Sequence, residues 1–275
     1  MIHQSIDYLE LTYPDVGNGQ LPVRNDVFPP EWSQTTVETK ARNGYSSAIR
    51  YPDGRALMWN DDSRRMGMHI EMTGSVCQRL EVDASHLQWF IQNGARITRL
   101  DCAVDITDTP CPFDEIWSLA KAGDYECRLR KPPSRNMDAA TGDTIYFGKM
   151  KSTACTRIYN KAAERKVAGV WTRVETMFRH GRANTVGKGI ANGQAIGSYV
   201  RGHVNLPRCQ WWADVMTMDA VKTRLARPEA DKRQEWLLKS VAPTLAKEIN
   251  LNGLDFWAMF RDAVFSQVTV DTNEW

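Results

Sequence analysis

The chain has 275 residues, six cysteines, and 35 Lys and Arg against 33 Asp and Glu, which is enough length for a sizeable core without a disulfide or metal staple. No two cysteines form a C-x-x-C pair and no histidine lies at zinc-finger spacing from them, so a zinc finger is excluded and reduced thiols are expected. Asp7 and Glu10 stand where a signal peptide needs an apolar run, and nowhere do 18 apolar residues follow one another. We therefore expect a soluble intracellular protein with no membrane partner.

The net charge of +2 hides an uneven distribution. Between Lys121 and Asn205 there are 16 Lys and Arg against 6 Asp and Glu, whereas the rest of the chain has 19 against 27. A basic middle of this kind is typical of a surface that binds phosphates. A solvated basic surface without a partner would give the same count, so both interpretations stay open at this point.

The first third of the sequence has the pattern of a sheet followed by a helix. Short β-type runs alternate there with turn residues such as Asp53 and Gly54. A helix over 86–95 places Leu87, Phe90 and Ile91 at helical spacing. The strands expected before this helix are residues 5–14, 35–41, 45–52, 56–60 and 67–74.

The pattern of strands and a helix then returns. A strand over 95–106 is followed by a helix over 112–123, which has Pro112 in its first turn and ends at Gly123. The next expected elements are a hairpin of strands 143–148 and 154–162 turning through 149–152, a strand over 169–179 and a helix over 182–192. The composition changes after Asn205, and helices are expected over 210–226, 230–249 and 253–265. The sequence therefore predicts an α+β protein with halves 1–94 and 95–205 and a helical C-terminal region, 206–275.

The strand over 95–106 carries two carboxylates on one face. Because side chains alternate along a strand, Arg99, Asp101 and Asp105 point away from the face of Leu100 and Val104. Two aspartates at this spacing lie about 13 Å apart by strand rise, which is too far to share one ion unless the strand bends. We therefore expect one of them to bind a metal and the other to hold Arg99 or another group next to the metal ligands. The alternative is a solvated sheet face with a salt bridge.

Glu175 repeats this arrangement in the strand over 169–179, where it shares a face with Arg173 and Arg179. A carboxylate beside phosphate-binding arginines suits Mg²⁺ or Mn²⁺ rather than zinc. A cross-strand ion pair on an exposed face is the alternative.

Tyr159 lies between two cations, Arg157 and Lys161, on one strand face, and Glu164 follows one helical turn later. A tyrosine with its usual pKa near ~10 is a poor nucleophile at neutral pH, and it needs nearby cations and a polarised phosphate to attack. A tyrosine in a strand that only packs is the alternative.

Two further motifs compete with this site. His69 and Glu71 alternate in one strand and could both reach a metal, in a degenerate form of the histidine pair of rolling-circle nucleases. The glycine-rich run at 187–193 lacks Walker spacing and no strand leads directly into it, so an ATPase is excluded.

Three segments, RLDCAVDI, GDTIYFGKMKSTACTRIYNKAAE and TRVETMFR, resemble in order and spacing the replication initiation factor family. That family includes Rep proteins of rolling-circle plasmids, relaxases of some conjugative elements and initiators of filamentous phages. GMHIEMTGSVCQRLE and WLLKSVAPTLAKEI look most like the phage members. The resemblance extends over roughly residues 5 to 250.

The resemblance implies a metal-dependent endonuclease and transferase that nicks one strand at a replication origin. A tyrosine would attack the phosphodiester, stay linked to the 5′ phosphate and leave a 3′ hydroxyl. By position Tyr159 matches this tyrosine and Arg157 and Lys161 its cationic neighbours, while Glu164 would accept a proton or support Lys161. The implied metal site, for Mg²⁺ or Mn²⁺, would use Asp101, Glu175 and Asp105.

The resemblance also implies a fold and partners. Two related antiparallel-sheet-plus-helix halves would form a concave DNA-binding surface in a nicking domain of residues 1–205. The partners would be single-stranded or hairpin origin DNA, a host helicase and DNA polymerase, and a second copy in a homodimer. The location would be the cytoplasm of a bacterial host cell.

Three alternatives to a nicking enzyme stay open. The first is a non-catalytic origin- or promoter-binding protein of the same fold. The second is a metal-dependent phosphodiesterase that uses water, with Tyr159 structural; if Tyr159 does not attack, Tyr146 is the other tyrosine to consider. The third is a nucleotidyltransferase with paired carboxylates, for which the sequence shows no nucleotide cradle.

Overall fold

The computed structural model of the protein describes residues 1–14, 27–30, 32, 37–60, 66–127, 132–138, 140–223 and 237–266. The chain forms two compact units, Met1–Leu225 and Ala226–Trp275. The first unit continues about twenty residues past the change of composition at residue 206, because α7 (Gln210–Val215) buries Trp211 and Trp212 in its core.

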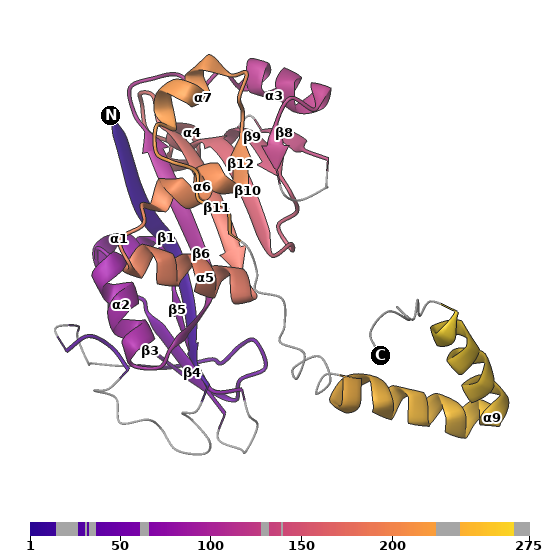
Figure 1. The fold of residues 1–275 in the computed structure, drawn as a ribbon. Helices are drawn as coiled ribbons and strands as arrows, with labels where there is room; N and C mark the ends of the chain where they lie inside the picture. Colours follow the sequence, from indigo (N-terminus) through magenta and orange to yellow (C-terminus); the bar gives the residue numbers. More distant parts are fainter. Residues whose placement is uncertain are drawn as a thin grey trace. The chain divides into compact units, whose positions relative to one another are not determined.

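In the described part of the chain, ten strands of the first unit form one antiparallel sheet (Figure 1). The sheet contains β1 (Ile2–Tyr13), β2 (Val37–Thr39), β3 (Ser47–Arg50), β4 (Ala56–Trp59), β5 (Met68–Met72), β6 (Arg96–Ile106), β8 (Ser134–Asp138), β9 (Gly142–Phe147), β10 (Ala154–Asn160) and β11 (Thr172–Arg179). Two short strands, β7 (Glu126–Cys127) and β12 (Val204–Asn205), pair separately. The predicted α+β class with a large antiparallel sheet is confirmed.

The strand order is mirrored about the centre of the sheet. β1 and β6 lie side by side in the middle; β5, β4, β3 and β2 follow outward from β1, and β11, β10, β9 and β8 follow outward from β6. In each half the first strand, β1 or β6, lies at the centre of the sheet. The next strand in the sheet, β2 or β8, lies at the edge, and the strands that follow it in sequence fill the space from the edge back to the centre. This is the order expected of two halves built alike.

Four of the described helices pack on one face of this sheet (Figure 1): α1 (Gly74–Arg79), α2 (Ala84–Gln92), α5 (His180–Ala191) and α6 (Ile196–His203). The other described helices of this unit are α3 (Phe113–Ala122), α4 (Lys161–Arg165) and α7. α5 and α6 both pack on β6, whose Leu100, Cys102, Val104 and Ile106 are fully buried beneath them. The core therefore lies between the helices and this face, and the opposite face of the same strands carries the polar side chains.

Two glycines of α5 allow this close packing. A Cβ on Gly187 would come within 2.2 Å of the Ile97 side chain, and one on Gly189 within 1.6 Å of the Tyr199 hydroxyl. The glycine-rich run thus serves packing of the helix on its neighbours, in agreement with the absence of a Walker motif.

Several elements differ from those predicted. α1, α6, β8 and the β7–β12 pair were not expected, and the helix predicted over 210–226 ends at Val215. The described residues that follow α7, up to residue 223, run along α6. Val221 N–H donates there to the Ser198 carbonyl at 2.8 Å. The Arg201 guanidinium donates to the Met218 carbonyl at 2.7 Å. These contacts with α6 hold the chain after Val215 in a non-helical conformation, although its sequence has helical periodicity.

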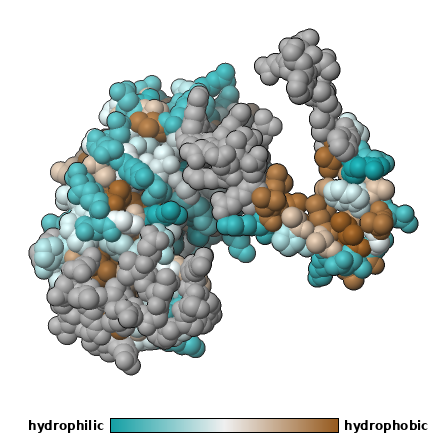
Figure 2. Space-filling model, turned by 60° about the horizontal axis from the view of Figure 1, so that its bottom comes forward, coloured by the Kyte–Doolittle hydropathy of each residue, from teal (hydrophilic) through white to brown (hydrophobic). Residues whose placement is uncertain are grey.

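The second unit contains a π-helical turn (Leu237–Val241) and α9 (Ala242–Phe265). Gly253, with φ of 74°, bends α9. The bend separates the two helices predicted over 230–249 and 253–265. The first of these predicted helices begins outside the described residues. Exposed apolar side chains on α9 include Leu251, Leu254 and Met259, and Figure 2 shows this unit with brown surface. Over the described residues, no helix has both the length and the apolar character needed to cross a bilayer.

A buried cation holds together the end of the sheet around β3 and β4. Arg55 is 0% exposed and its guanidinium lies 4.3 Å from the ring centre of Phe28, 4.4 Å from that of Tyr51 and 4.9 Å from that of Trp32. Its Nε donates to the Asp53 carboxylate at 2.9 Å. Three aromatic faces and one carboxylate thus replace the water lost by this charge.

We predict that Arg55→Met lowers the free energy of unfolding by about 3 kcal/mol, because it leaves Asp53 without its cation and removes the contacts with three rings. Urea denaturation measures the change. Arg50→Met, at an exposed position of the neighbouring strand β3, is the matched control and should change stability by no more than about 0.5 kcal/mol. Equal losses in the two variants would contradict the role given to the buried cluster.

Candidate active site

The polar face of the sheet brings together alternate side chains of β6, β11, β10 and β9. Residues directly opposite each other in an antiparallel pair point to the same face. The pairing places these side chains in adjacent rows, which contain Asp101, Met177 and Cys155, then Glu175, Arg157 and Tyr146, then Asp105, Arg173 and Tyr159.

Glu175 is the centre of this face and is 1% exposed. It accepts a hydrogen bond from Arg157 Nη2 at 2.8 Å on one oxygen and from the Tyr159 hydroxyl at 2.9 Å on the other. Lys161 Nζ donates to the Tyr159 hydroxyl at 3.3 Å. The structure thus gathers the predicted tyrosine, both predicted cations and one predicted carboxylate into a single network.

Lys161 reaches this network because α4 begins immediately after β10. The side chain of Asn160 caps the helix by accepting from Ala163 N–H at 2.9 Å, so Lys161 is the first helical residue. Glu164, one turn later, forms an ion pair with Lys161. The expected support of Lys161 by Glu164 is therefore present as a contact.

Tyr159 is held inside this network. It is 3% exposed, and burial together with the charge of Glu175 raises the pKa of its hydroxyl far above the ordinary value, although Arg157 and Arg173 oppose the shift. A hydroxyl that donates to a buried carboxylate stays protonated and turned away from solvent. Attack by Tyr159 therefore requires this hydrogen bond to break and the site to open.

Tyr146 lies on the same face and is more accessible. It is the cross-strand partner of Arg157 on β9, one strand farther toward the edge, and is half-buried. Arg157 therefore has Tyr159 two residues along its own strand and Tyr146 opposite it on the next strand; Tyr159 is enclosed, whereas Tyr146 is half-buried.

Asp101 is paired with Arg99, as predicted for one of the two aspartates of its strand. Arg99 donates to it from Nε at 3.0 Å and from Nη2 at 2.6 Å, and the guanidinium of Arg99 lies 3.8 Å from the ring centre of Tyr8. Burial raises the pKa of Asp101 to about 6 and nearby Glu175 adds to this, while Arg99 opposes it. Asp101 is thus a carboxyl that changes charge just below neutral pH.

Asp105 is held by a separate network. Arg173 donates to it from Nε and Nη2, both at 2.7 Å, and the Trp171 indole N–H donates at 2.6 Å. Arg173 also forms an ion pair with Asp7, a residue that the sequence did not identify as part of a site. The pairing of β1 with β6 shifts between Ile6 and Tyr8, so a β-bulge places Asp7 there, and regular alternation could not have predicted it.

The predicted metal ligands are therefore each occupied by an arginine: Asp101 by Arg99, Glu175 by Arg157 and Asp105 by Arg173. Nowhere in the described ranges do three or more His, Cys, Asp or Glu side chains converge as a metal site would require. As arranged, these residues do not form a metal site, and their assignment as ligands stays a prediction.

The rival pair on β5 is also engaged. His69 Nδ1 lies 3.1 Å from the Thr12 hydroxyl, and Glu71 forms an ion pair with Arg42 at 2.5 Å. Burial lowers the pKa of His69. Both side chains lie on the polar face, opposite Thr12 and Glu10 of β1, without a further ligand that would complete a metal site in the described part.

Comparison with known families matches residues 95–262 to the family described as replication initiation factor, and the chain belongs to this family. The matched region contains the whole network around Glu175. A protein of Bacillus subtilis (strain 168) named "Putative DNA relaxase NicK" is 28% identical over 225 residues, which cover 67% of this chain and 63% of that protein. The chain thus spans less than two thirds of the length of this relative.

A solved structure supports the fold. The structure described as a rolling circle replication initiator protein from Geobacillus stearothermophilus matches 82% of this chain and 100% of its own, with a TM-score of 0.63 and 21% sequence identity. The protein is therefore a member of a family of replication initiators and has the fold of a rolling-circle initiator.

We predict a pH-dependent contribution of Asp101 to stability. Its pKa of about 6 in the folded protein exceeds the ordinary value, so the unfolded state loses its proton first and the stability of the wild type falls as pH rises through 6. Relative to Asp101→Asn, the wild type should lose about 2 kcal/mol of unfolding free energy between about pH 4 and about pH 7. Urea denaturation at a series of pH values measures this difference, and a difference independent of pH would contradict the raised pKa.

Proposed function

We propose that this protein nicks one strand of origin DNA by tyrosine transesterification and so initiates rolling-circle replication. The observation that carries the proposal is the Glu175–Arg157 pair on the polar face, where Tyr159 bonds Glu175 and Tyr146 lies directly opposite Arg157 on the neighbouring strand. Membership of a replication initiation factor family supports the biological setting.

The reaction forms a bond between the tyrosine oxygen and phosphorus and breaks the bond from phosphorus to the 3′ oxygen. The 3′ oxygen leaves as a hydroxyl with a proton, and the 5′ phosphate stays on tyrosine. Since a phosphodiester is exchanged for a phosphodiester, the nick can later be closed without ATP. Arg157 and Lys161 would stabilise the charge on the phosphoryl oxygens, and Glu175 would hold Arg157 in place.

The sequence-based prediction assigns the attack to Tyr159. The burial of that hydroxyl and its bond to Glu175 favour Tyr146, and we propose Tyr146 as the attacking residue. In this arrangement Tyr159 positions Glu175, and Glu164 positions Lys161.

Other parts of the proposal come from the family resemblance. Mg²⁺ or Mn²⁺ is proposed as cofactor, although the predicted ligands are paired with arginines, so no step above depends on it. Single-stranded or hairpin origin DNA on a concave sheet surface, a host helicase and polymerase, a homodimer, a phage origin and the cytoplasm of a bacterial host complete the proposed setting.

The test is to incubate wild type, Tyr146→Phe and Tyr159→Phe with single-stranded fragments tiled across the origin of its own genome, with Mn²⁺ or with EDTA, and to run denaturing gels. We expect a covalent protein–DNA species for wild type, its complete loss in Tyr146→Phe, and a reduced rate in Tyr159→Phe. Tyr45→Phe, remote on the first half of the sheet, is the matched control and should react as wild type does.

Other outcomes assign other functions. Loss of the adduct only in Tyr159→Phe would return the attack to the enclosed tyrosine. Cleavage without an adduct would indicate a phosphodiesterase that uses water. DNA binding with neither cleavage nor adduct, with and without metal, would indicate a non-catalytic origin-binding protein.

A further inference from the structure

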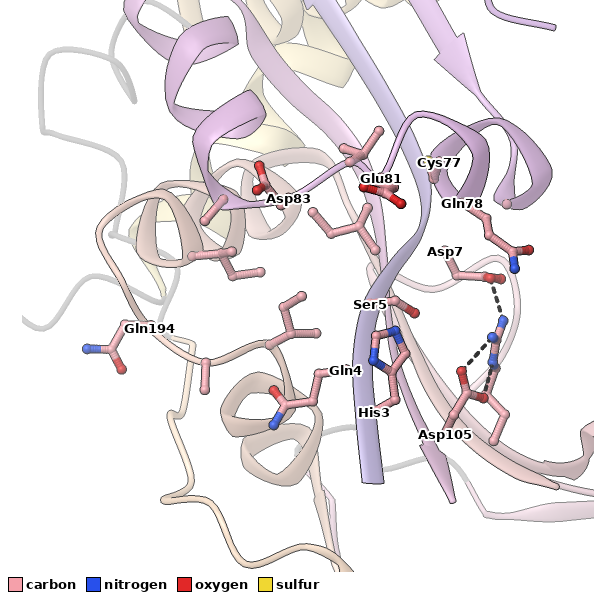
Figure 3. Close-up of a pocket in the computed structure, with 18 of the residues that line it drawn as sticks. His3, Gln4, Ser5, Asp7, Cys77, Gln78, Glu81, Asp83, Asp105 and Gln194 are labelled. Carbon is pink, nitrogen blue, oxygen red and sulfur yellow. Dashed lines mark hydrogen bonds and ion pairs between the residues drawn. The ribbon is translucent and has the colours of Figure 1, made fainter. Parts of the chain in front are cut away.

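A cavity of about 680 Å³ lies beside the polar face, along the first half of β1. This half of β1 pairs with β6 alone, because the pairing with β5 begins at Leu9. The connection between α1 and α2 lies on one side of the cavity and the connection between α5 and α6 on another, as Figure 3 shows around Asp83 and Gln194. It is therefore a space next to an open strand edge and not an extension of the core.

The charges around the cavity disfavour a phosphate inside it. Four carboxylates line it, those of Asp7, Glu81, Asp83 and Asp105, against the guanidiniums of Arg165 and Arg173. Arg173 is already bound by Asp7 and Asp105, which Figure 3 shows on either side of the dashed contacts. A polyanion would be repelled from the interior, whereas a neutral group with N–H donors would find acceptors there.

The remaining lining suits a flat ring. Trp171 provides an aromatic side chain whose orientation is fixed by its N–H bond to Asp105. Apolar walls come from Ile6, Val82, Ile190 and Ile196, and amide groups from Gln4, Gln78 and Gln194. Aromatic faces, apolar walls and a few polar groups at the edges are the features with which proteins hold single nucleobases.

The cavity is also close to the proposed reaction. Arg173 and Asp105 line it, and they lie on β11 and β6 in the polar face. Tyr146, the proposed attacking residue, lies on β9, three strand spacings or about 14 Å from β6. A nucleotide one or two positions from the attacked phosphate could therefore turn its base into the cavity while its phosphates stay on the polar face.

We propose that this cavity binds one unstacked base of the single-stranded origin, within two nucleotides of the cleaved phosphate, and prefers adenine, cytosine or guanine to thymine. The preference follows from Glu81 above all, because Asp7, Asp83 and Asp105 already accept hydrogen bonds within the protein; its carboxylate would accept from the exocyclic amino groups that thymine lacks. The cost of unstacking is small in a single strand. This inference rests on the proposed nicking function and specifies its substrate.

The experiment measures binding and adduct formation separately. Origin fragments with one abasic site at each position in turn are titrated with the wild type in EDTA, and affinity is followed by fluorescence anisotropy. We expect one position near the nick at which the abasic site, or a thymine, weakens binding about tenfold. The same fragments with Mn²⁺ report the adduct, so a sensitive position without an adduct would reject nicking and keep the base site.

Cavity-filling variants connect that position to this cavity. Ala195→Trp and Gln194→Trp place a large ring at exposed positions of the lining, so at least one is expected to fold as the wild type does by circular dichroism. Both should bind the intact fragment about tenfold more weakly and lose sensitivity to the abasic site. Gln88→Trp, at an exposed position of α2 outside the lining, should behave as wild type. Uniform affinities across all abasic positions, or sensitivity retained in a folded cavity variant, would overturn the proposal.

Discussion

The ion pair between Glu175 and Arg157 is the interaction around which the polar face is organised. A carboxylate that is 1% exposed is costly unless both oxygens find partners, and here one binds a guanidinium and the other a tyrosine hydroxyl. Removal of Arg157 would leave a buried charge, so the position of Arg157 is fixed by the fold before any substrate arrives. A cation held in advance is what stabilisation of a phosphoryl group requires.

The same solution recurs along the central strands. Asp101 is satisfied by Arg99 and Asp105 by Arg173, so the face is a set of paired charges rather than an uncompensated cluster. On the other face of β10 and β11, Thr156 bonds both Thr176 and His203 of α6 beneath the reacting side chains. The site is therefore supported on rigid strands from both sides, which favours precise placement of its side chains.

Much of this arrangement follows from the alternation of side chains in a strand. Alternation places Asp101, Asp105, Glu175 and Tyr159 on one face, and the end signals of α3 at Pro112 and Gly123 agree with the structure. Sequence indicates Arg99 as the partner of an aspartate in its own strand, but it could not show that Arg157 pairs with Glu175 or Arg173 with Asp105, because pairing across strands depends on register. The sequence also could not show that Asp7 joins the network, because a β-bulge places it there. Nor could it show the cavity beside β1, because connections that are distant in sequence form its walls.

The central claim is that a tyrosine of this face forms the bond to DNA, and peptide mapping tests it most directly. Trypsin separates the two candidates, because Tyr146 falls in the peptide 136–149 and Tyr159 in the peptide 158–161. Mass spectrometry of the nuclease-trimmed adduct should find the nucleotide on peptide 136–149. Nucleotide on peptide 158–161 would move the attack to the enclosed tyrosine, and nucleotide on a peptide from outside the polar face would contradict the account.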